Sequence, residues 1–213
     1  MAMGANKRMA KAARQELYRR LILEAAEASF AERGYEDARI QDIAERAGLS
    51  VGTLYATFPG KYEIVRALHE WRLTELLAAS TASVQPRAPA TEVLLGGTAV
   101  LVRWLVDHPA YLRMTLGEGL SWASDARYRS GEQVSAWHQG IALLAALLER
   151  GMDEGTIHRG DPQLMAKLLS AAQQVYLANW VDAGMTADPQ VLIEHIQQHI
   201  RRGFFRRAGE EGQ

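Results

Sequence analysis

Apolar residues recur at helical spacing along almost the whole chain, and the strict alternation that indicates β-strands is scarce. The pattern predicts an all-α protein of about nine helices, with no internal repeat. The first helix is expected to close at Phe30, ahead of a stop at Gly34. The others are expected at about 40–47, 51–58, 61–82, 91–107, 111–117, 132–152, 162–184 and 189–207.

Prolines and glycines mark the expected ends of these helices. Ser83 to Ala90 is the main proline-rich loop. Asp161-Pro162 and Asp188-Pro189 each place a capping residue before a proline at the first helical position, where the missing N–H is tolerated. The segment from Gly117 to Ser130 holds several glycine or serine breaks, so it predicts no clear element.

The segment IQDIAERAGLSVGTLYATF, Ile40 to Phe58, predicts two short helices joined at a glycine. Gly48 can adopt the left-handed backbone that a three-residue turn requires, and Ser50 can cap the second helix. Ala44 is small enough for a close helix crossing. Leu49 fills the angle between the two helices, and the pair is sealed from beneath by Ile43, Leu54 and Phe58. This is the pattern of a helix-turn-helix, whose second helix has the size to enter the major groove of B-DNA.

The residues expected to face outward suit contact with DNA. Gly52 permits close approach of the helix backbone, and Thr53 offers a hydroxyl and a methyl group to base edges. Tyr55 and Thr57 offer hydroxyls to phosphates, and Lys61 offers a positive charge. Helix–glycine–helix elements also occur in all-α proteins that do not bind DNA, so the pattern alone leaves a purely structural role open.

Composition narrows the class of protein. The 213 residues suit one large domain or two small ones, and 48% apolar and 23% charged residues are ordinary for a globular chain. The lack of cysteine excludes disulfides, zinc fingers and cysteine nucleophiles. The N-terminus lacks the apolar stretch of a secretory signal, and no run approaches the roughly 18 apolar residues of a membrane span. We therefore expect a cytoplasmic protein that makes no membrane contact.

The net charge of −1 argues at first against a nucleic-acid partner, but the charges are unevenly distributed. Residues 1–20 hold six basic residues against one acidic residue, a net charge of +5, which leaves −6 for the remainder. The basic residues are Lys7, Arg8, Lys11, Arg14, Arg19 and Arg20. The positive charge thus lies just ahead of the helix-turn-helix, as a DNA-contacting arm or as a solvated tail.

Over about residues 19–65 the sequence resembles the TetR family of one-component transcriptional regulators. The resemblance is carried by Ile22, Ala25, Ala26, Phe30, Gly34, Tyr35, Ile43, Ala44, Ala47, Gly48, Leu49, Ser50, Gly52, Thr53, Leu54, Tyr55, Phe58 and Lys61. It implies an all-α homodimer in which residues 1–65 bind a palindromic double-stranded operator and residues 66–213 bind a small effector and dimerise. It assigns DNA contact to Arg39, Gln41, Ser50, Val51, Gly52, Thr53, Tyr55, Thr57 and Lys61.

Two of these positions depart from the family pattern. The family often has threonine where Arg39 stands, and arginine cannot cap the helix, although it can reach a phosphate. The family often has histidine or tyrosine where Thr57 stands, so the shorter side chain makes Thr57 the weakest of the expected contacts.

The C-terminal part carries two apolar stripes at helical spacing. The segment from Gly155 to Pro162 resembles the lead-in to the family's dimerisation helices. The stripes would close a four-helix bundle across a two-fold axis, or they would both pack inside one subunit. The residues assigned to the dimer contact are Leu168, Ala172, Val175, Leu192, Ile196 and Ile200.

Large side chains on the middle helices are the candidates for effector binding, with an ordinary core as the alternative. They are Trp104, Met114, Trp122, Trp137, His138, Tyr176 and Trp180. His195 and His199 lie at helical spacing but have no third ligand in view, so we expect neither a metal nor a cofactor. Phosphate-loop and hydrolase motifs are absent from the sequence, so no catalysis is expected.

The expected function is that of a homodimeric repressor released from its operator by a small apolar or aromatic effector. One alternative is a small all-α ligand-binding protein or enzyme with a vestigial helix-turn-helix. A second is an activator that works through a protein partner.

Overall fold

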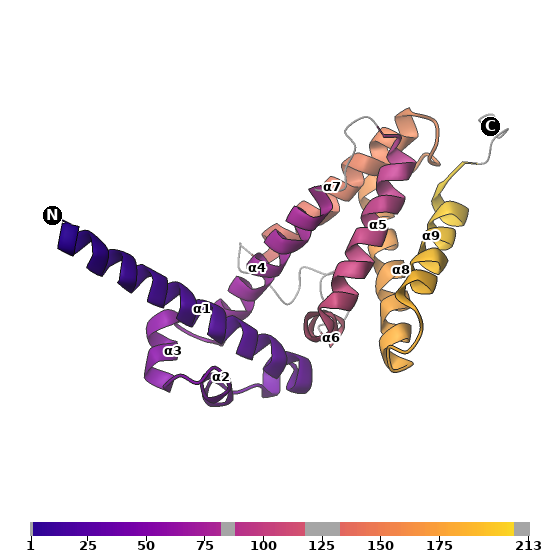
Figure 1. Ribbon diagram of the computed structural model, residues 1–213. Coiled ribbons are helices and arrows are strands. Elements are labelled where there is room, and N and C mark those ends of the chain that lie inside the picture. The colour runs from indigo at the N-terminus through magenta and orange to yellow at the C-terminus, as the bar shows by residue number, and fades with distance from the viewer. Residues whose placement is uncertain (1, 82–87, 118–132, 207–213) are drawn as a thin grey trace. The chain divides into compact units, whose positions relative to one another are not determined.

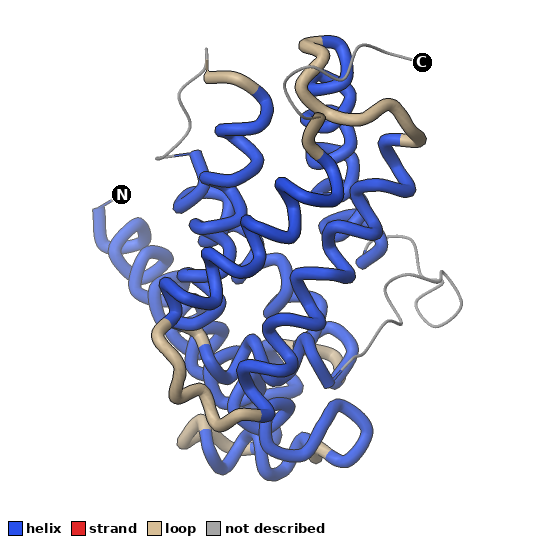
Figure 2. The backbone as a smooth tube through the Cα atoms, turned by 90° about the vertical axis from the view of Figure 1, so that its right-hand side faces the viewer, coloured by secondary structure: helices blue, strands red, loops and turns tan. Residues whose placement is uncertain are grey.

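The computed structural model describes residues 2–81, 88–117 and 133–206 of the chain. Almost all of these residues are helical, which confirms the all-α prediction (Figure 1, Figure 2). Among them, β-type pairing is limited to one isolated antiparallel bridge between Ile157 and Phe205. The helices are α1 (Ala2–Asp37), α2 (Ile40–Arg46), α3 (Val51–Thr57), α4 (Lys61–Thr81), α5 (Ala90–Asp107), α6 (Pro109–Gly117), α7 (Gln133–Asp153), α8 (Pro162–Asp182) and α9 (Pro189–Phe204).

The chain divides into two compact units. The first unit consists of Met1–Arg72 and Ala110–Glu118, and the second of Leu73–Pro109 and Gly119–Gln213. The sequence places a single boundary after residue 65, whereas the first unit also takes in more of α4 and most of α6. It does so because Met114 of α6 is buried in its core, and Tyr111 packs against that core.

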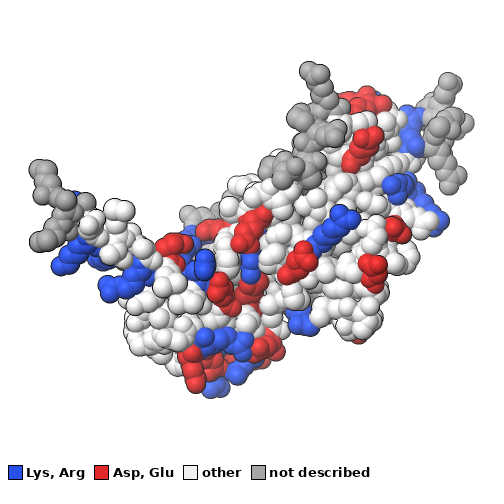
Figure 3. All heavy atoms as spheres, in the orientation of Figure 1, with Lys and Arg blue, Asp and Glu red and all other residues white. Residues whose placement is uncertain are grey.

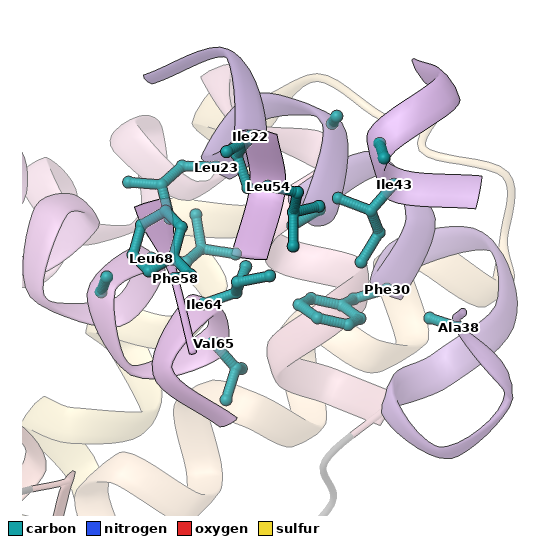
Figure 4. Packing of buried hydrophobic residues seen from close by; sticks show 14 of the residues in the cluster. Ile22, Leu23, Phe30, Ala38, Ile43, Leu54, Phe58, Ile64, Val65 and Leu68 are labelled. Carbon is teal, nitrogen blue, oxygen red and sulfur yellow. The ribbon is translucent and has the colours of Figure 1, made fainter. Parts of the chain in front are cut away.

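The core of the first unit joins α1, α2, α3, the start of α4 and α6. Phe30, Ile43 and Leu54 are 2%, 0% and 0% exposed, and they converge with residues of α4 in Figure 4. A three-helix unit with short α2 and α3 has little apolar area of its own, so the flanking helices supply the rest of the core. This packing holds α3 with one face inward and the other outward.

A kink interrupts α1 at Gly34. Its φ of 77° and ψ of 167° are non-helical, and a last helical turn then continues to Asp37. Glycine adopts a positive φ without the steric penalty of a Cβ atom, so it accommodates the change of direction. The predicted stop at Gly34 is therefore a bend in the helix, with a short turn beyond it.

A buried ion pair ties α1 to α4 within the first unit. Glu27 is 5% exposed, and the Nε of Arg72 donates to its Oε1 at 3.2 Å while a second guanidinium nitrogen donates to Oε2. This two-bond geometry gives both carboxylate oxygens a partner, as a buried carboxylate requires. No local pattern indicates the pair, because 45 positions separate its members.

The second unit is built around α5, α7, α8 and α9. α5 packs against α7 and α9, and α8 packs against the same two helices. The predicted caps are confirmed: Asp161 accepts hydrogen bonds from the backbone at the start of α8, and Asp188 does so at the start of α9. Within the described residues, no helix combines the length and apolar character needed to cross a membrane.

Candidate nucleic-acid interface

α2 and α3 have the backbone geometry of a helix-turn-helix. The chain turns at Gly48, whose φ is 67°, a conformation that favours glycine. The backbone N–H of Leu49 donates to the carbonyl of Ala44 at 2.9 Å and closes the turn. Ala44 and Leu54 are 1% and 0% exposed, so both helices press their apolar faces into the same core. The angle between α2 and α3 is thereby set by packing as well as by the turn.

Hydroxyl groups at the start of α3 are engaged locally. The Oγ of Ser50 accepts a hydrogen bond from the backbone N–H of Thr53 at 3.1 Å, so Ser50 caps the helix. The Oγ of Ser50 and the Oγ1 of Thr53 lie 2.8 Å apart. The Oγ1 of Thr57 donates to the carbonyl of Thr53 at 2.9 Å. The Thr57 hydroxyl must therefore break an intrahelical bond before it can donate to a phosphate.

The outward face of α3 combines a glycine with an exposed tyrosine. Tyr55 is 50% exposed, and Gly52 is exposed one turn earlier. A Cβ atom at Gly52 would meet only the Oγ of Ser50, at 3.8 Å, so the space beside this residue is open in the free protein. The face therefore offers a close approach of the backbone at one position and a phenolic hydroxyl at another.

The remaining contacts expected from the sequence fall into two groups. Arg39 and Gln41 are exposed at the start of α2, and Arg39 makes no side-chain capping bond. Both side chains are placed to reach outward from the same end of the helix. Val51, in contrast, is partly buried against the core of the first unit. Its position suits support of α3 more than contact with DNA.

Lys61 lies at the start of α4 and closes the end of α1. Its ammonium donates to the backbone carbonyls of Tyr35 at 2.6 Å, Glu36 at 3.0 Å and Ala38 at 3.1 Å. The same nitrogen lies 4.6 Å from the centre of the Tyr35 ring. An ammonium has three N–H donors, so these carbonyls use its full donor capacity. The structure thus gives Lys61 a role in joining α1 to α4, where the sequence suggested a phosphate contact.

Replacing Lys61 by methionine is expected to destabilise the protein by about 1–3 kcal/mol, because the last carbonyls of α1 lose a charged donor. The salt dependence of DNA binding is expected to stay unchanged, since the substitution removes no bond to a phosphate. Urea unfolding and binding titrations at several salt concentrations measure the two effects. Lys167→Met, at an exposed position on α8, is the matched control. If the substitution instead reduced the salt dependence of DNA binding and left the stability unchanged, Lys61 would be a phosphate contact after all.

Two ion pairs join α1 to α2, and sequence reasoning did not identify them. Arg46 donates to both carboxylate oxygens of Glu32, at 2.9 and 2.6 Å, and Arg33 pairs with Asp42. The hydrogen bonds from Arg46 lower the pKa of Glu32, because they favour the ionised carboxylate. The stabilisation is present above the ordinary glutamate pKa and is lost as the pH falls through the lowered value. Separations of 9 and 14 positions follow no helical period, so no local signal could reveal these pairs.

The basic N-terminal segment is a continuation of α1. Residues 6–17 are helical and exposed, a length of about 18 Å at the rise of an α-helix. We call residues 6–17 the helical arm. Figure 3 shows Lys and Arg gathered along it. Lys7, Lys11 and Arg14 recur at helical spacing and so share one side of the arm.

Three of the expected effector-binding residues occupy separate settings in the second unit. Trp104 stacks on His108 with ring centres 4.1 Å apart. The rings of Tyr176 on α8 and His199 on α9 have their centres 5.9 Å apart, with 69° between their planes. The indole N–H of Trp180 donates to the carbonyl of Ala187 at 2.9 Å, within the connection between α8 and α9. These contacts give each ring a packing role of its own.

The other expected effector residues lie in the first unit or where the structure describes no side chain. Met114 is 4% exposed and belongs to the core of the first unit. Trp122 lies outside the described residues. Trp137 and His138 are described only as backbone, in α7. In the described part of the chain, no group of three or more His, Cys, Asp or Glu side chains is placed to hold a metal ion.

The expected dimer contacts separate into an exposed set and a buried set. On α8, Leu168 and Val175 are 55% and 59% exposed, and Ala172 lies partly exposed between them. On α9, the expected contacts are only 6%, 1% and 1% exposed: Leu192, Ile196 and Ile200. The apolar side of α9 is already buried in the core of its own unit, so it is not available to contact a second copy of the chain. We therefore revise the predicted dimer contact to the outer face of α8.

The chain is similar in sequence to known bacterial regulators. Residues 22–68 match the profile of the bacterial regulatory proteins of the tetR family. The chain is 24% identical over 187 residues to the uncharacterized HTH-type transcriptional regulator YuxN of Bacillus subtilis. This match covers 85% of this chain and 61% of that protein. It is 31% identical over 139 residues to the HTH-type transcriptional repressor KstR2 of Mycobacterium tuberculosis. That match covers 63% of this chain and 66% of that protein. The matches span less than two thirds of either relative.

A solved structure shares the fold of this chain. The fatty acid degradation regulator FadR from Bacillus halodurans superposes with a TM-score of 0.73 at 20% sequence identity. The superposition covers 87% of this chain and 95% of that protein. The fold is therefore common to the two proteins along nearly their whole length.

Proposed function

The chain belongs to the TetR family of bacterial regulatory proteins, and we propose that it is a homodimeric transcriptional repressor that binds a palindromic DNA operator. The observation that carries the proposal is the orientation of α3. Leu54 anchors the helix in the core, while Gly52 and Tyr55 lie on its exposed face. A helix held in this way can insert that face into the major groove.

Different exposed residues of the helix-turn-helix would contact the bases and the phosphates of the operator. Gly52 and Thr53 would approach base edges, which carry the sequence information. Tyr55 and Arg39 would reach phosphates, which position the protein without reading the sequence. Ser50 would act mainly through the cap that orients the first turn of α3.

Dimerisation would use the exposed apolar face of α8. Leu164 and Leu168 are both 55% exposed, and Val175 is 59% exposed, at spacings that keep them on one side of the helix. An apolar stripe of this kind is typical of a protein–protein contact. The two copies would place their α3 helices about 34–36 Å apart, one turn of B-DNA.

A small effector would regulate binding through a population shift. An effector that binds better to a conformation with wrongly spaced α3 helices lowers operator affinity by as much as its preference for that conformation. The name of the structural relative FadR refers to fatty acid degradation, and that of KstR2 refers to repression. The name of KstR2 supports a repressor, and we place its action in the cytoplasm.

The proposal is tested by selecting bound sequences from a pool of random duplexes with the full-length protein. The expected result is a palindrome bound at physiological salt at least about a thousandfold more tightly than a scrambled duplex. Equal affinity for all duplexes would favour a ligand-binding protein or enzyme with a vestigial helix-turn-helix. Transcription that rises with the protein on its palindrome would favour an activator.

Neutralising one side of the helical arm is expected to weaken DNA binding for all sequences alike. Replacing Lys7, Lys11 and Arg14 by glutamine removes charge that phosphates would attract. The slope of log affinity against log salt should shrink by about 0.9 for each phosphate that the arm no longer neutralises. Binding titrations on operator and scrambled duplexes measure the slope, and Lys167→Gln on α8 is the control. An unchanged slope would show that the arm does not bind phosphates.

A further inference from the structure

One side of α1 runs without a break from the core of the first unit into the helical arm. Between residues 6 and 33 the backbone is helical throughout, and the kink at Gly34 lies beyond. Positions three or four apart on a helix share a side. One such series begins in the core with the buried residues Ser29, Ala25 and Ile22, and continues through Tyr18, Arg14, Lys11 and Lys7. We call this the inner side of α1.

The inner side of α1 meets the helix-turn-helix. α1 packs against α2 and α3. Ile22 belongs to the same buried cluster as Leu54 of α3 and Phe58, which directly follows α3 (Figure 4). The central carbon of the Arg19 guanidinium lies 5.1 Å from the centre of the Phe58 ring. α1 therefore leaves the core beside the C-terminal end of α3, and the side that contacts α3 is the side that carries basic residues further along.

The two sides of the helical arm differ in charge. The inner side holds three exposed basic residues: Lys7, Lys11 and Arg14. The opposite side of the arm, which we call the outer side, holds Met9, Ala13 and Leu17 and no basic residue. Met9 and Leu17 are 70% and 50% exposed. A tail that is merely solvated needs no such sorting, whereas a polyanion lying along the inner side would attract all three cations at once.

We propose that the inner side of the helical arm is a second DNA site, which binds phosphates of the operator beyond those that α3 reaches. This rests on the proposed DNA-binding function. Operator DNA fits the site because it is a polyanion, and because the inner side is continuous with the face of α1 that holds α3. Lys7 lies 15 positions before Ile22, so the inner side reaches about 22 Å past the core. That length spans up to about six base pairs of B-DNA.

A helical arm binds differently from a flexible basic tail. The helix fixes its cations on one side and at a set distance from α3, so less conformational freedom is lost when they meet phosphates. The side that carries the charge should therefore matter as well as the amount of charge. General attraction between a basic tail and DNA has no such dependence.

Moving charge from the inner to the outer side tests the proposal. The permuted arm combines Lys7→Met with Met9→Lys, and Lys11→Ala with Ala13→Lys, so composition and net charge are unchanged. Full-length wild-type protein is expected to bind an operator duplex with long flanks at least about tenfold more tightly than the permuted protein. Fluorescence anisotropy measures both affinities, and a thermal melt checks the fold. Equal affinities would overturn the proposal.

Hydroxyl-radical cleavage of the same duplex shows where on the DNA the arm lies. Wild-type protein is expected to protect up to about six more base pairs for each half-site than the permuted protein does. The extra protection should lie outside the bases whose substitution abolishes operator preference, since those are the bases that α3 reads. Identical footprints for the two proteins would overturn the proposal.

Ala12→Pro tests whether the arm binds as a helix. Proline interrupts the helix at the middle of the arm but removes no charge. The buried part of α1 begins at Ile22, well beyond the substitution, so the melting temperature should hardly change. Operator affinity is expected to fall toward that of the permuted protein. Affinity equal to that of the wild type would show that a flexible tail is sufficient and would overturn the helical site.

Scrambled duplex and lipid vesicles separate this proposal from others. The advantage of wild-type over permuted protein should persist on scrambled duplex, because phosphates carry no sequence information. That advantage without any operator preference would support the arm and overturn the repressor. Operator preference with equal affinities of the two proteins would overturn the arm and leave the repressor standing. Tighter binding of wild-type protein to phosphatidylserine vesicles than to scrambled duplex would make a lipid surface the partner and overturn the DNA site.

Discussion

Gly52→Val is expected to lower operator affinity at least about a hundredfold while the protein stays folded. The valine side chain would project from the exposed face of α3 into space that is open in the free protein. On DNA that space would be taken by the floor of the groove, so the helix could no longer approach. Stability should hardly change, because valine suits a helix no worse than glycine.

Fluorescence anisotropy on operator and scrambled duplexes measures the effect, with a thermal melt to check the fold. Non-specific binding should persist, since it depends on charges such as those of the helical arm. Gly203→Val is the matched control: Gly203 is exposed on α9, and a Cβ atom there meets nothing within 4 Å. Operator affinity that survives Gly52→Val would mean that α3 does not enter the groove.

Placing charges on the outer face of α8 is expected to produce monomers. In Leu168→Glu combined with Val175→Glu, each carboxylate would lie in the proposed contact between copies, and its burial there would be strongly unfavourable. Both positions are exposed in the single chain, so the fold should be retained. A palindrome needs two copies, and we expect operator affinity to fall at least about a hundredfold.

Sedimentation measures the mass of the variant, and circular dichroism its helix content. Leu143→Glu is the matched control, because Leu143 is 62% exposed on α7. Ile196→Glu makes a different prediction: Ile196 is 1% exposed within its own unit, so this variant should lose helix content as well as assembly. A stable dimer of the α8 variant would place the contact between copies elsewhere.

The helix-turn-helix could be predicted because its determinants are local. A turn at Gly48, a cap at Ser50 and a buried Leu54 all depend on residues a few positions apart, so the sequence contains the information directly. The same holds for the caps at Asp161 and Asp188. The kink at Gly34 also falls where the glycine predicted a change in the chain.

The contacts of Lys61 and Gln173 could not be predicted in this way. Lys61 stands at a spacing that suits a phosphate contact, yet its ammonium binds carbonyls more than twenty positions earlier in the chain. Gln173 lies on an apolar face, and its partner Thr98 is 75 positions away. Neither partnership follows a helical period, so both arise only when distant helices pack together.

The sequence by itself determined the helices, their ends and which side of each is apolar, because helical period and capping act over a few residues. Tertiary structure decided what each apolar side covers. The stripes of α8 and α9 read alike in the sequence, but Ile196 is buried in its own unit while Leu168 stays exposed. An apolar stripe predicts that one side of a helix will be buried. Which surface buries it depends on how helices far apart in the chain pack together.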